Sequence, residues 1–130
     1  RGIADRNKSL WGGWFMQLKE EAIYHAGDTG YSKDFIETKN RLGSPFLSLI
    51  PVGAYAPRWF MKTHHVNPPE AIQIAIDLES EKNFGMHWGT FQLTDEEILE
   101  PPKLLKEALR DKDLPDEFFT ILKPGQVVAL

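Results

Sequence analysis

The chain has 130 residues, the length of one ordinary domain, and an apolar content of 42%, which is enough for a packed core. Its 15 basic and 19 acidic side chains leave a net charge of −4, whereas a nucleic-acid groove usually needs a basic excess. The absence of cysteine excludes a disulfide framework and cysteine-based zinc sites. We therefore expect one globular domain that does not bind nucleic acid.

The first third of the chain predicts a β-hairpin followed by a helix. Residues 9–15 are typical of a strand, although glycines interrupt it, and residues 21–26 form the next strand across a short connection. The tryptophans of the first strand are expected to pack against the sheet. Residues 27–30 (GDTG) form a turn, and residues 32–42 have the apolar spacing of a helix.

The middle of the chain predicts a buried strand, an irregular segment and a second helix. Residues 46–52 are continuously apolar, as in a strand that is buried on both faces. Residues 53–67 read as irregular. Asn67 is the expected N-cap of a helix that opens at Pro68, and we expect Lys82-Asn83 to end that helix.

The last third predicts one more strand, one more helix and a closing hairpin. Residues 84–87 suit a short strand, and Pro101-Pro102 begin the helix. Residues 118–122 and 126–129 flank a Lys-Pro-Gly turn, which favours a hairpin. This order of elements predicts an α/β fold: one sheet with helices on one face.

Two motifs carry candidate metal chemistry. Asp28 lies between glycines at the end of a strand, and its carboxylate could bridge two metal ions, which lie roughly 3.5–4 Å apart in two-metal sites. The alternative is a turn that merely ends the strand. His87 follows a buried strand, and neutral imidazole suits zinc; the alternative is a core histidine bonded to a backbone carbonyl. Two ligands alone do not make a zinc site.

Several sequence blocks resemble a known protein family, and this resemblance indicates a more specific function than the spacing of residues does. The blocks LWGGWF, AGDTGY, GAYAPRWFMKTHHVNPPEA and MHWGTF, the last followed by EPPKLLKEAL, occur in collinear order over almost the whole chain. They resemble the C-terminal half of the N-acyl-phosphatidylethanolamine-hydrolysing phospholipase D family, within the metallo-β-lactamase superfamily. The resemblance implies part of an αββα sandwich with two Zn²⁺ ions. It also implies that Asp28 bridges the metals, that His87 is the last histidine ligand, and that His65 lies near the reacting phosphate.

The chain departs from the family in one large respect. The family's HxHxDH metal motif is absent, and neither His25 nor His64 restores its spacing. We therefore expect residues 1–130 to be a single partial domain that lacks the N-terminal half of the fold, a view that the start at Arg1 supports. Such a half is expected to be inactive alone and to pair with the N-terminal half or with a second copy.

The segment from Arg58 to His65 (RWFMKTHH) is rich in basic and aromatic residues. Arg58 and Lys62 are candidate contacts for a phosphate or head group, and Trp59 is a candidate contact for an acyl chain. The alternative is a loop that its aromatic residues anchor, with solvated charges.

The resulting hypothesis is a zinc-dependent phosphodiester hydrolase of the phospholipase D type. It would be cytoplasmic or attached to the membrane periphery, and would act on N-acyl-phosphatidylethanolamine or a related lipid. His65 would orient the phosphate or protonate the leaving oxygen. A second hypothesis is a dimeric aspartic protease that uses Asp28-Thr29-Gly30, although Ala26-Gly27 stand where such proteases carry large apolar residues. A third is a non-catalytic interaction domain with one exposed apolar sheet face.

Overall fold

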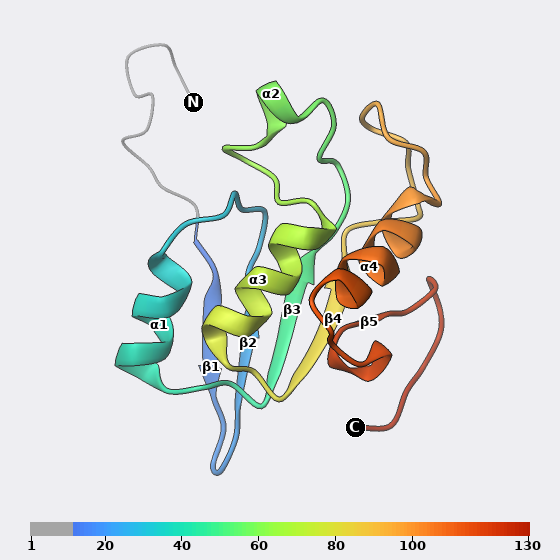
Figure 1. Cartoon of the computed structure of the whole chain (residues 1–130). Helices are drawn as coiled ribbons and strands as arrows, with labels where there is room; N and C mark the ends of the chain where they lie inside the picture. The colour runs from blue at the N-terminus through green and yellow to red at the C-terminus, as the bar shows by residue number, and fades with distance from the viewer. Residues whose placement is uncertain (1–11) are drawn as a thin grey trace, which may run out of the picture.

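A computed structural model describes residues 12–130, which form one five-stranded sheet (Figure 1). The strands lie in the order of the chain: β1 (Trp14–Gln17), β2 (Ala22–His25), β3 (Leu47–Pro51), β4 (Lys82–Met86) and β5 (Thr120–Ile121). The first two strands are antiparallel, as in the expected hairpin, and each later strand is parallel to its neighbour. Because parallel strands need crossovers, helices connect them.

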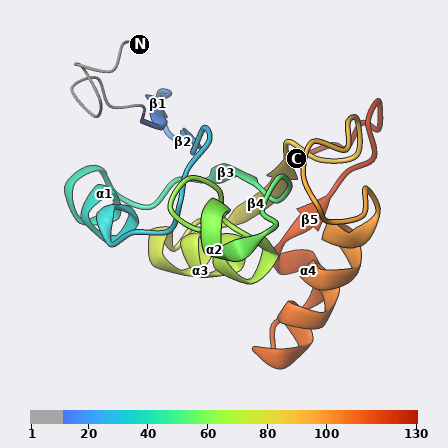
Figure 2. The same cartoon turned by 90° about the horizontal axis from the view of Figure 1, so that it is seen from above.

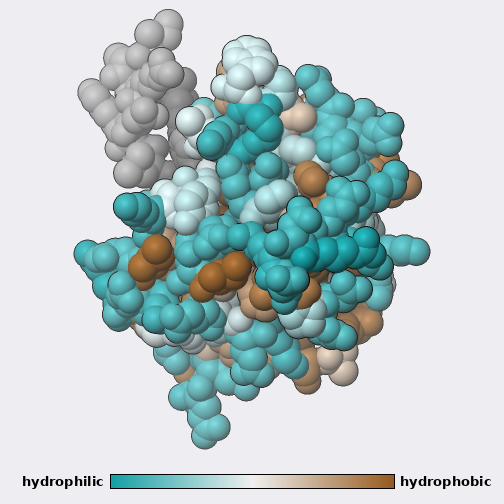
Figure 3. All heavy atoms as spheres, viewed as in Figure 1, coloured by the Kyte–Doolittle hydropathy of each residue, from teal (hydrophilic) through white to brown (hydrophobic). Residues whose placement is uncertain are grey.

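The longer helices lie on one face of this sheet, so the predicted fold class is confirmed (Figure 2). They are α1 (Asp34–Leu42), α3 (Pro68–Leu78) and α4 (Glu100–Asp111). Two shorter elements complete the fold: α2 (Arg58–Met61) and the 3₁₀ helix η2 (Asp116–Phe118). The outward surface of the helical layer is mainly hydrophilic, as expected of amphipathic helices in water (Figure 3). None of the helices in the described range combines the length and the apolar character that crossing a bilayer would require.

Helix α3 begins where the sequence predicts. The side chain of Asn67 accepts a hydrogen bond from the backbone N–H of Glu70 at 3.0 Å, and the carboxylate of Glu70 accepts one from the N–H of Asn67 at 3.3 Å. This capping box satisfies two of the amides that a helix start leaves unpaired. The helix ends at Leu78 because Glu79 adopts a left-handed conformation. The prediction that Lys82-Asn83 end this helix was therefore wrong, since both residues lie in β4.

Three further local predictions were wrong or incomplete. The first strand lies at Trp14–Gln17, later than expected, and residues 9–11 of that prediction fall outside the described range. The segment expected to be irregular contains α2. The closing hairpin does not form: β5 pairs in parallel with β4, and residues 122–130 contain no strand. The Lys-Pro-Gly turn exists, since the Gln126 N–H donates to the carbonyl of Lys123 at 2.9 Å, but β4 supplies the partner strand.

The core fills the space between the sheet and the helices. Its fully buried side chains come from both layers and are mainly aliphatic: Ile50, Val52, Val66, Ile72, Ile74, Leu78 and Phe119. One polar network crosses this core. The Asn83 side chain accepts hydrogen bonds from the hydroxyls of Ser48 and Ser80, and its amide donates to the carbonyl of Phe118 at 2.9 Å. The network ties β3 and β4 to η2 without leaving the amide unsatisfied.

The opposite face of the sheet is only partly covered by the described residues. The strand register places Trp14, Met16 and Leu49 on this face. Trp14 is 72% exposed and Met16 is 42% exposed, so the tryptophan is not packed as the sequence suggested. No helix of the described range lies on this side (Figure 2).

Candidate functional site

The candidate site lies at the edge of the sheet where β2, β3 and β4 end. These strands are parallel, so the segments that follow them emerge at one edge, at the top of Figure 1. Ligands of open α/β sheets generally bind outside the carboxyl ends of the strands. The three segments contribute Asp28, the loop that leads to α2, and His87.

Asp28 lies in a turn that close backbone packing holds in place. Gly27 adopts a positive φ of 67°, and its N–H donates to Nδ1 of His25 at 3.1 Å. A Cβ on Gly30 would stand 2.6 Å from the carbonyl oxygen of Thr63, so only glycine lets the two backbones approach this closely. The turn expected from the GDTG motif therefore exists, and it presents the Asp28 carboxylate at the end of β2.

His87 follows β4 directly and has a strained backbone. Its φ is 58°, in the left-handed region that residues with a side chain seldom adopt. A Cβ on Gly53, two residues after the buried end of β3, would lie 2.4 Å from the carbonyl oxygen of His87. Strain of this kind concentrates at functional sites, where surrounding contacts enforce it.

The structure brings the two expected ligands together. Nδ1 of His87 lies 3.0 Å from Oδ1 of Asp28, and the two side chains remain 46% and 63% exposed. Imidazole nitrogen and carboxylate oxygen are both zinc ligands, so the pair fits part of a metal site. Within residues 12–130, however, no group of three or more histidine, cysteine, aspartate or glutamate side chains could hold a metal ion. A complete zinc site needs three or four protein ligands.

His65 lies beside this pair. Its side chain shares a hollow of about 510 Å³ with Asp28 and His87, and the other walls are Gly53, Ala54, Trp88, Thr90, Phe91 and Leu93. The pKa of His65 is lowered, mainly because the ring is partly buried. The nearby Asp28 carboxylate raises this pKa, whereas His64 and His87 lower it further. His65 is therefore mainly neutral near pH 7, and it can accept a proton or a hydrogen bond there.

The three predicted substrate contacts, Arg58, Trp59 and Lys62, differ in whether their side chains are exposed or bonded within the protein. Trp59 is 86% exposed, and Lys62 is exposed as well, so both can reach a ligand outside the hollow. The guanidinium of Arg58, in contrast, is engaged within the protein. One nitrogen pairs with Glu70 at 2.6 Å, and the other donates to the backbone carbonyl of His65 at 2.7 Å.

Glu96 anchors the loop between β3 and α2, a role that the sequence analysis missed. Its carboxylate accepts hydrogen bonds from the backbone N–H groups of Ala54 at 2.7 Å and Ala56 at 2.9 Å, and from the hydroxyl of Thr94 at 2.7 Å. A third amide, that of Tyr55, lies 3.3 Å away. No local pattern signals the contacts with Ala54 and Ala56, because these residues lie 42 and 40 positions from Glu96 in the chain.

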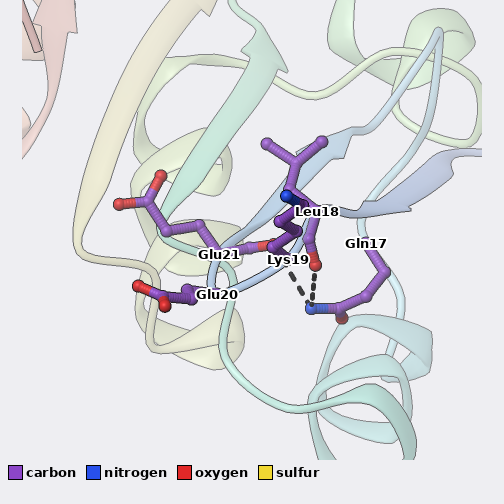
Figure 4. Close-up of a pocket in the computed structure, with 5 residues that line it drawn as sticks. All are labelled: Gln17, Leu18, Lys19, Glu20 and Glu21. Atoms are coloured by element: carbon purple, nitrogen blue, oxygen red, sulfur yellow. Dashed lines mark hydrogen bonds between the residues drawn. The ribbon is translucent and has the colours of Figure 1, made fainter.

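Another hollow lies at the opposite edge of the sheet, away from this chemistry. It has a volume of about 840 Å³, and its walls are residues 17–21, from the end of β1 and the turn that leads to β2 (Figure 4). The Gln17 side-chain amide donates to the carbonyls of Leu18 and Glu21, both at 3.2 Å. These bonds close the turn, so the hollow is a structural feature of the hairpin.

Comparison with known proteins identifies the family. The family model described as the beta-lactamase superfamily domain matches residues 1–88, more than half of the chain. The chain therefore belongs to the beta-lactamase superfamily. Its fold resembles that of YhfI of Bacillus subtilis, a metallo-β-lactamase fold protein, with a TM-score of 0.61 and 19% identity over 85% of this chain and 41% of that one. The isothiocyanate hydrolase of Delia radicum gut bacteria gives a TM-score of 0.67 at 18% identity, over 91% of this chain and 43% of that one.

Sequence comparison finds relatives with higher identity than these solved structures. The chain is 40% identical to the N-acyl-phosphatidylethanolamine-hydrolyzing phospholipase D 1 of Caenorhabditis elegans, over 98% of this chain and 36% of that protein. It is 45% identical to the mitochondrial protein of the same name in Saccharomyces cerevisiae, over 82% of this chain and 23% of that protein. A metal-dependent hydrolase of Methanopyrus kandleri is 32% identical over 88% of this chain and 44% of that protein. The chain thus spans less than half the length of these relatives.

These findings confirm the partial metallo-β-lactamase fold, and a protein named as a metal-dependent hydrolase is among the relatives of the chain. They leave the aspartic-protease hypothesis without support. Asp28 lies at a strand end of a mixed α/β sheet beside His87, whereas that hypothesis needs the carboxylate to face a second copy of itself.

Proposed function

We propose that this chain forms the C-terminal half of a zinc-dependent phosphodiester hydrolase of the phospholipase D type. The observation that carries the proposal is the approach of Nδ1 of His87 to 3.0 Å from Oδ1 of Asp28, beyond the ends of β4 and β2 and beside His65. Likeness to relatives named for the hydrolysis of N-acyl-phosphatidylethanolamine supports that lipid, or a related one, as the substrate.

In this proposal Asp28 and His87 hold two Zn²⁺ ions together with ligands from outside the described residues. Bound zinc supplies Lewis acidity and lowers the pKa of water. His65 orients the phosphate, or takes up a proton and then gives it to the leaving oxygen. Its half-buried ring lies within the hollow that it shares with the ligands, as such a role requires.

The substrate is proposed to approach over α2. Lys62 contributes a positive charge for the phosphate or head group, and Trp59 offers an exposed aromatic surface for an acyl chain. Phe91 and Leu93 extend an apolar wall from the hollow outward. Contact with the periphery of a membrane fits this arrangement, because the lipid would enter from the bilayer surface.

The open face of the sheet supports the proposal that another part of the fold packs against this half-domain. Trp14 and Met16 are exposed there, and large apolar patches usually mark an interaction surface. We propose that the rest of the fold, in the same polypeptide or in another chain, packs on this face and completes the metal site. A purely non-catalytic interaction role would need the same face but no metal.

The decisive test is Asp28→Asn in the intact protein. This substitution replaces the charged carboxylate by a neutral amide, so it should reduce the amount of bound zinc. It should also slow hydrolysis of N-acyl-phosphatidylethanolamine by at least about 1,000-fold, because metal catalysis contributes several kcal/mol to the lowering of the barrier. Zinc content by atomic spectroscopy and the hydrolysis rate in mixed micelles measure both effects. Asp116→Asn, at an exposed aspartate 3.8 Å from Lys106, is the matched control. Retention of zinc and of activity in Asp28→Asn would contradict the proposal.

A further inference from the structure

The guanidinium of Arg58 connects three segments of the chain. Nη2 lies 2.6 Å from Oε2 of Glu70, and Nη1 donates to the carbonyl of His65 at 2.7 Å and to that of Tyr55 at 3.3 Å. About a third or less of either charged side chain is exposed, 30% for Arg58 and 22% for Glu70. Partial burial strengthens such charge-assisted hydrogen bonds relative to exposed ones.

Glu70 is itself rigidly placed. The same carboxylate oxygen that pairs with Arg58 accepts the N–H of Asn67 and completes the capping box of α3. Helix α3 lies in the core through Ile72 and Ile74, both fully buried. Arg58 thus ties the backbone of His65 to the most deeply buried helix of the structure.

The segment around His65 is also tied to the Asp28 turn from the other side. The N–H of Val66 donates to the carbonyl of Thr29 at 2.9 Å. The Thr63 carbonyl packs so closely on Gly30 that no side chain would fit there. His65 therefore lies between two fixed points, one at Arg58 and one at the turn that carries Asp28.

We propose that Arg58 is a positioning residue that, paired with Glu70, holds the backbone of His65 so that its ring stays in the hollow with Asp28 and His87. The inference rests on the proposed function for the role of His65. It replaces the expectation that Arg58 binds the phosphate, since the guanidinium already bridges Glu70 and the His65 carbonyl.

Three variants separate positioning from phosphate binding in the intact zinc-loaded protein. Arg58→Ala should lower kcat by about 100-fold and leave KM within about threefold, because misplacement by about 1 Å can cost that much in rate. Arg58→Lys should not restore kcat, because an ammonium cannot bridge Glu70 and the His65 carbonyl as a guanidinium does. Glu70→Gln should lower kcat as well, although glutamine still suits the capping box.

A phosphate-binding Arg58 would give the opposite pattern. Arg58→Ala would raise KM, Arg58→Lys would restore most of the affinity, and Glu70→Gln would release the guanidinium and leave kcat unchanged. That pattern would overturn the proposal. Arg41→Ala removes an exposed ion pair with Glu37 and is the matched control, with wild-type kinetics expected. Melting curves for every variant check that the fold is intact.

Hydrogen exchange provides a readout that does not depend on activity. The amide of Val66 should exchange about tenfold faster in Arg58→Ala and in Glu70→Gln than in the wild type, while core amides of β3 stay unchanged. Unchanged exchange at Val66 would overturn the proposal. If the wild type does not hydrolyse N-acyl-phosphatidylethanolamine, the proposed function fails, and the exchange data still decide whether Arg58 holds this segment.

Discussion

The two faces of the central sheet differ in how completely this chain covers them. On the helical side Ile50 and Val52 are fully buried, and the buried polar side chain of Asn83 is hydrogen-bonded to Ser48, Ser80 and the carbonyl of Phe118. On the other side Trp14 and Met16 are exposed, and Leu49 is only half-buried. The candidate metal site is likewise incomplete, since Asp28 and His87 meet and the described residues supply no third candidate ligand beside them. The chain thus completes one layer of packing but only part of a site.

The largest expected contrast is between neighbours on β3. Ile50→Ala should lower the free energy of unfolding by about 2–5 kcal/mol, because it leaves a cavity in the core. Leu49→Ala, on the other face, should cost about 1 kcal/mol in the 130-residue chain, since its side chain is already partly in water. Urea denaturation measures both. Equal losses would show that the open face is covered in solution, and sedimentation would then reveal a second copy.

The next contrast compares neighbours on β4. Asn83→Leu should cost about 1–3 kcal/mol, because it leaves the buried Ser48 hydroxyl and the Phe118 carbonyl without their partner. Lys82→Leu, on the open face, removes only the contact of its ammonium with the Phe46 ring at 5.2 Å and should change stability by at most about 1 kcal/mol. Thermal unfolding of the two variants tests this order. A larger loss for Lys82→Leu would contradict it.

The smallest expected effect on stability concerns the loop between β3 and α2, which hydrogen bonds to the Glu96 carboxylate hold in place. Burial raises the pKa of Glu96, but hydrogen bonds from Thr94, Ala56 and Ala54 outweigh it and hold the pKa below its ordinary value of 4.5. A lowered pKa in the folded state adds stability above pH 4.5 that is lost as the pH falls through the folded value. Glu96→Gln should therefore cost about 1 kcal/mol at pH 7 and less below pH 4.5. A difference independent of pH would contradict this account.

Local signals in the sequence determined several features correctly. Asn67 and Glu70 are three residues apart, so their capping box depends on nothing distant, and α3 begins as expected. The hairpin of β1 and β2 and the turn around Asp28 likewise follow from neighbouring residues. A carboxylate and an imidazole that each lie within three residues of the end of a strand also indicate Asp28 and His87 as candidate ligands.

Only the tertiary structure decided which of these groups meet. Asp28 and His87 come together because β2, β3 and β4 are parallel neighbours, an arrangement that sequence spacing does not encode. The same holds for Arg58, because only the folded chain brings Glu70 and the His65 carbonyl to its guanidinium. Strand β5 is a third example, because it pairs with β4 and not, as the sequence predicted, with the residues that follow it in the chain. Helix starts and turns depend on bonds within a few residues, whereas sites depend on which strand ends the packed core brings side by side.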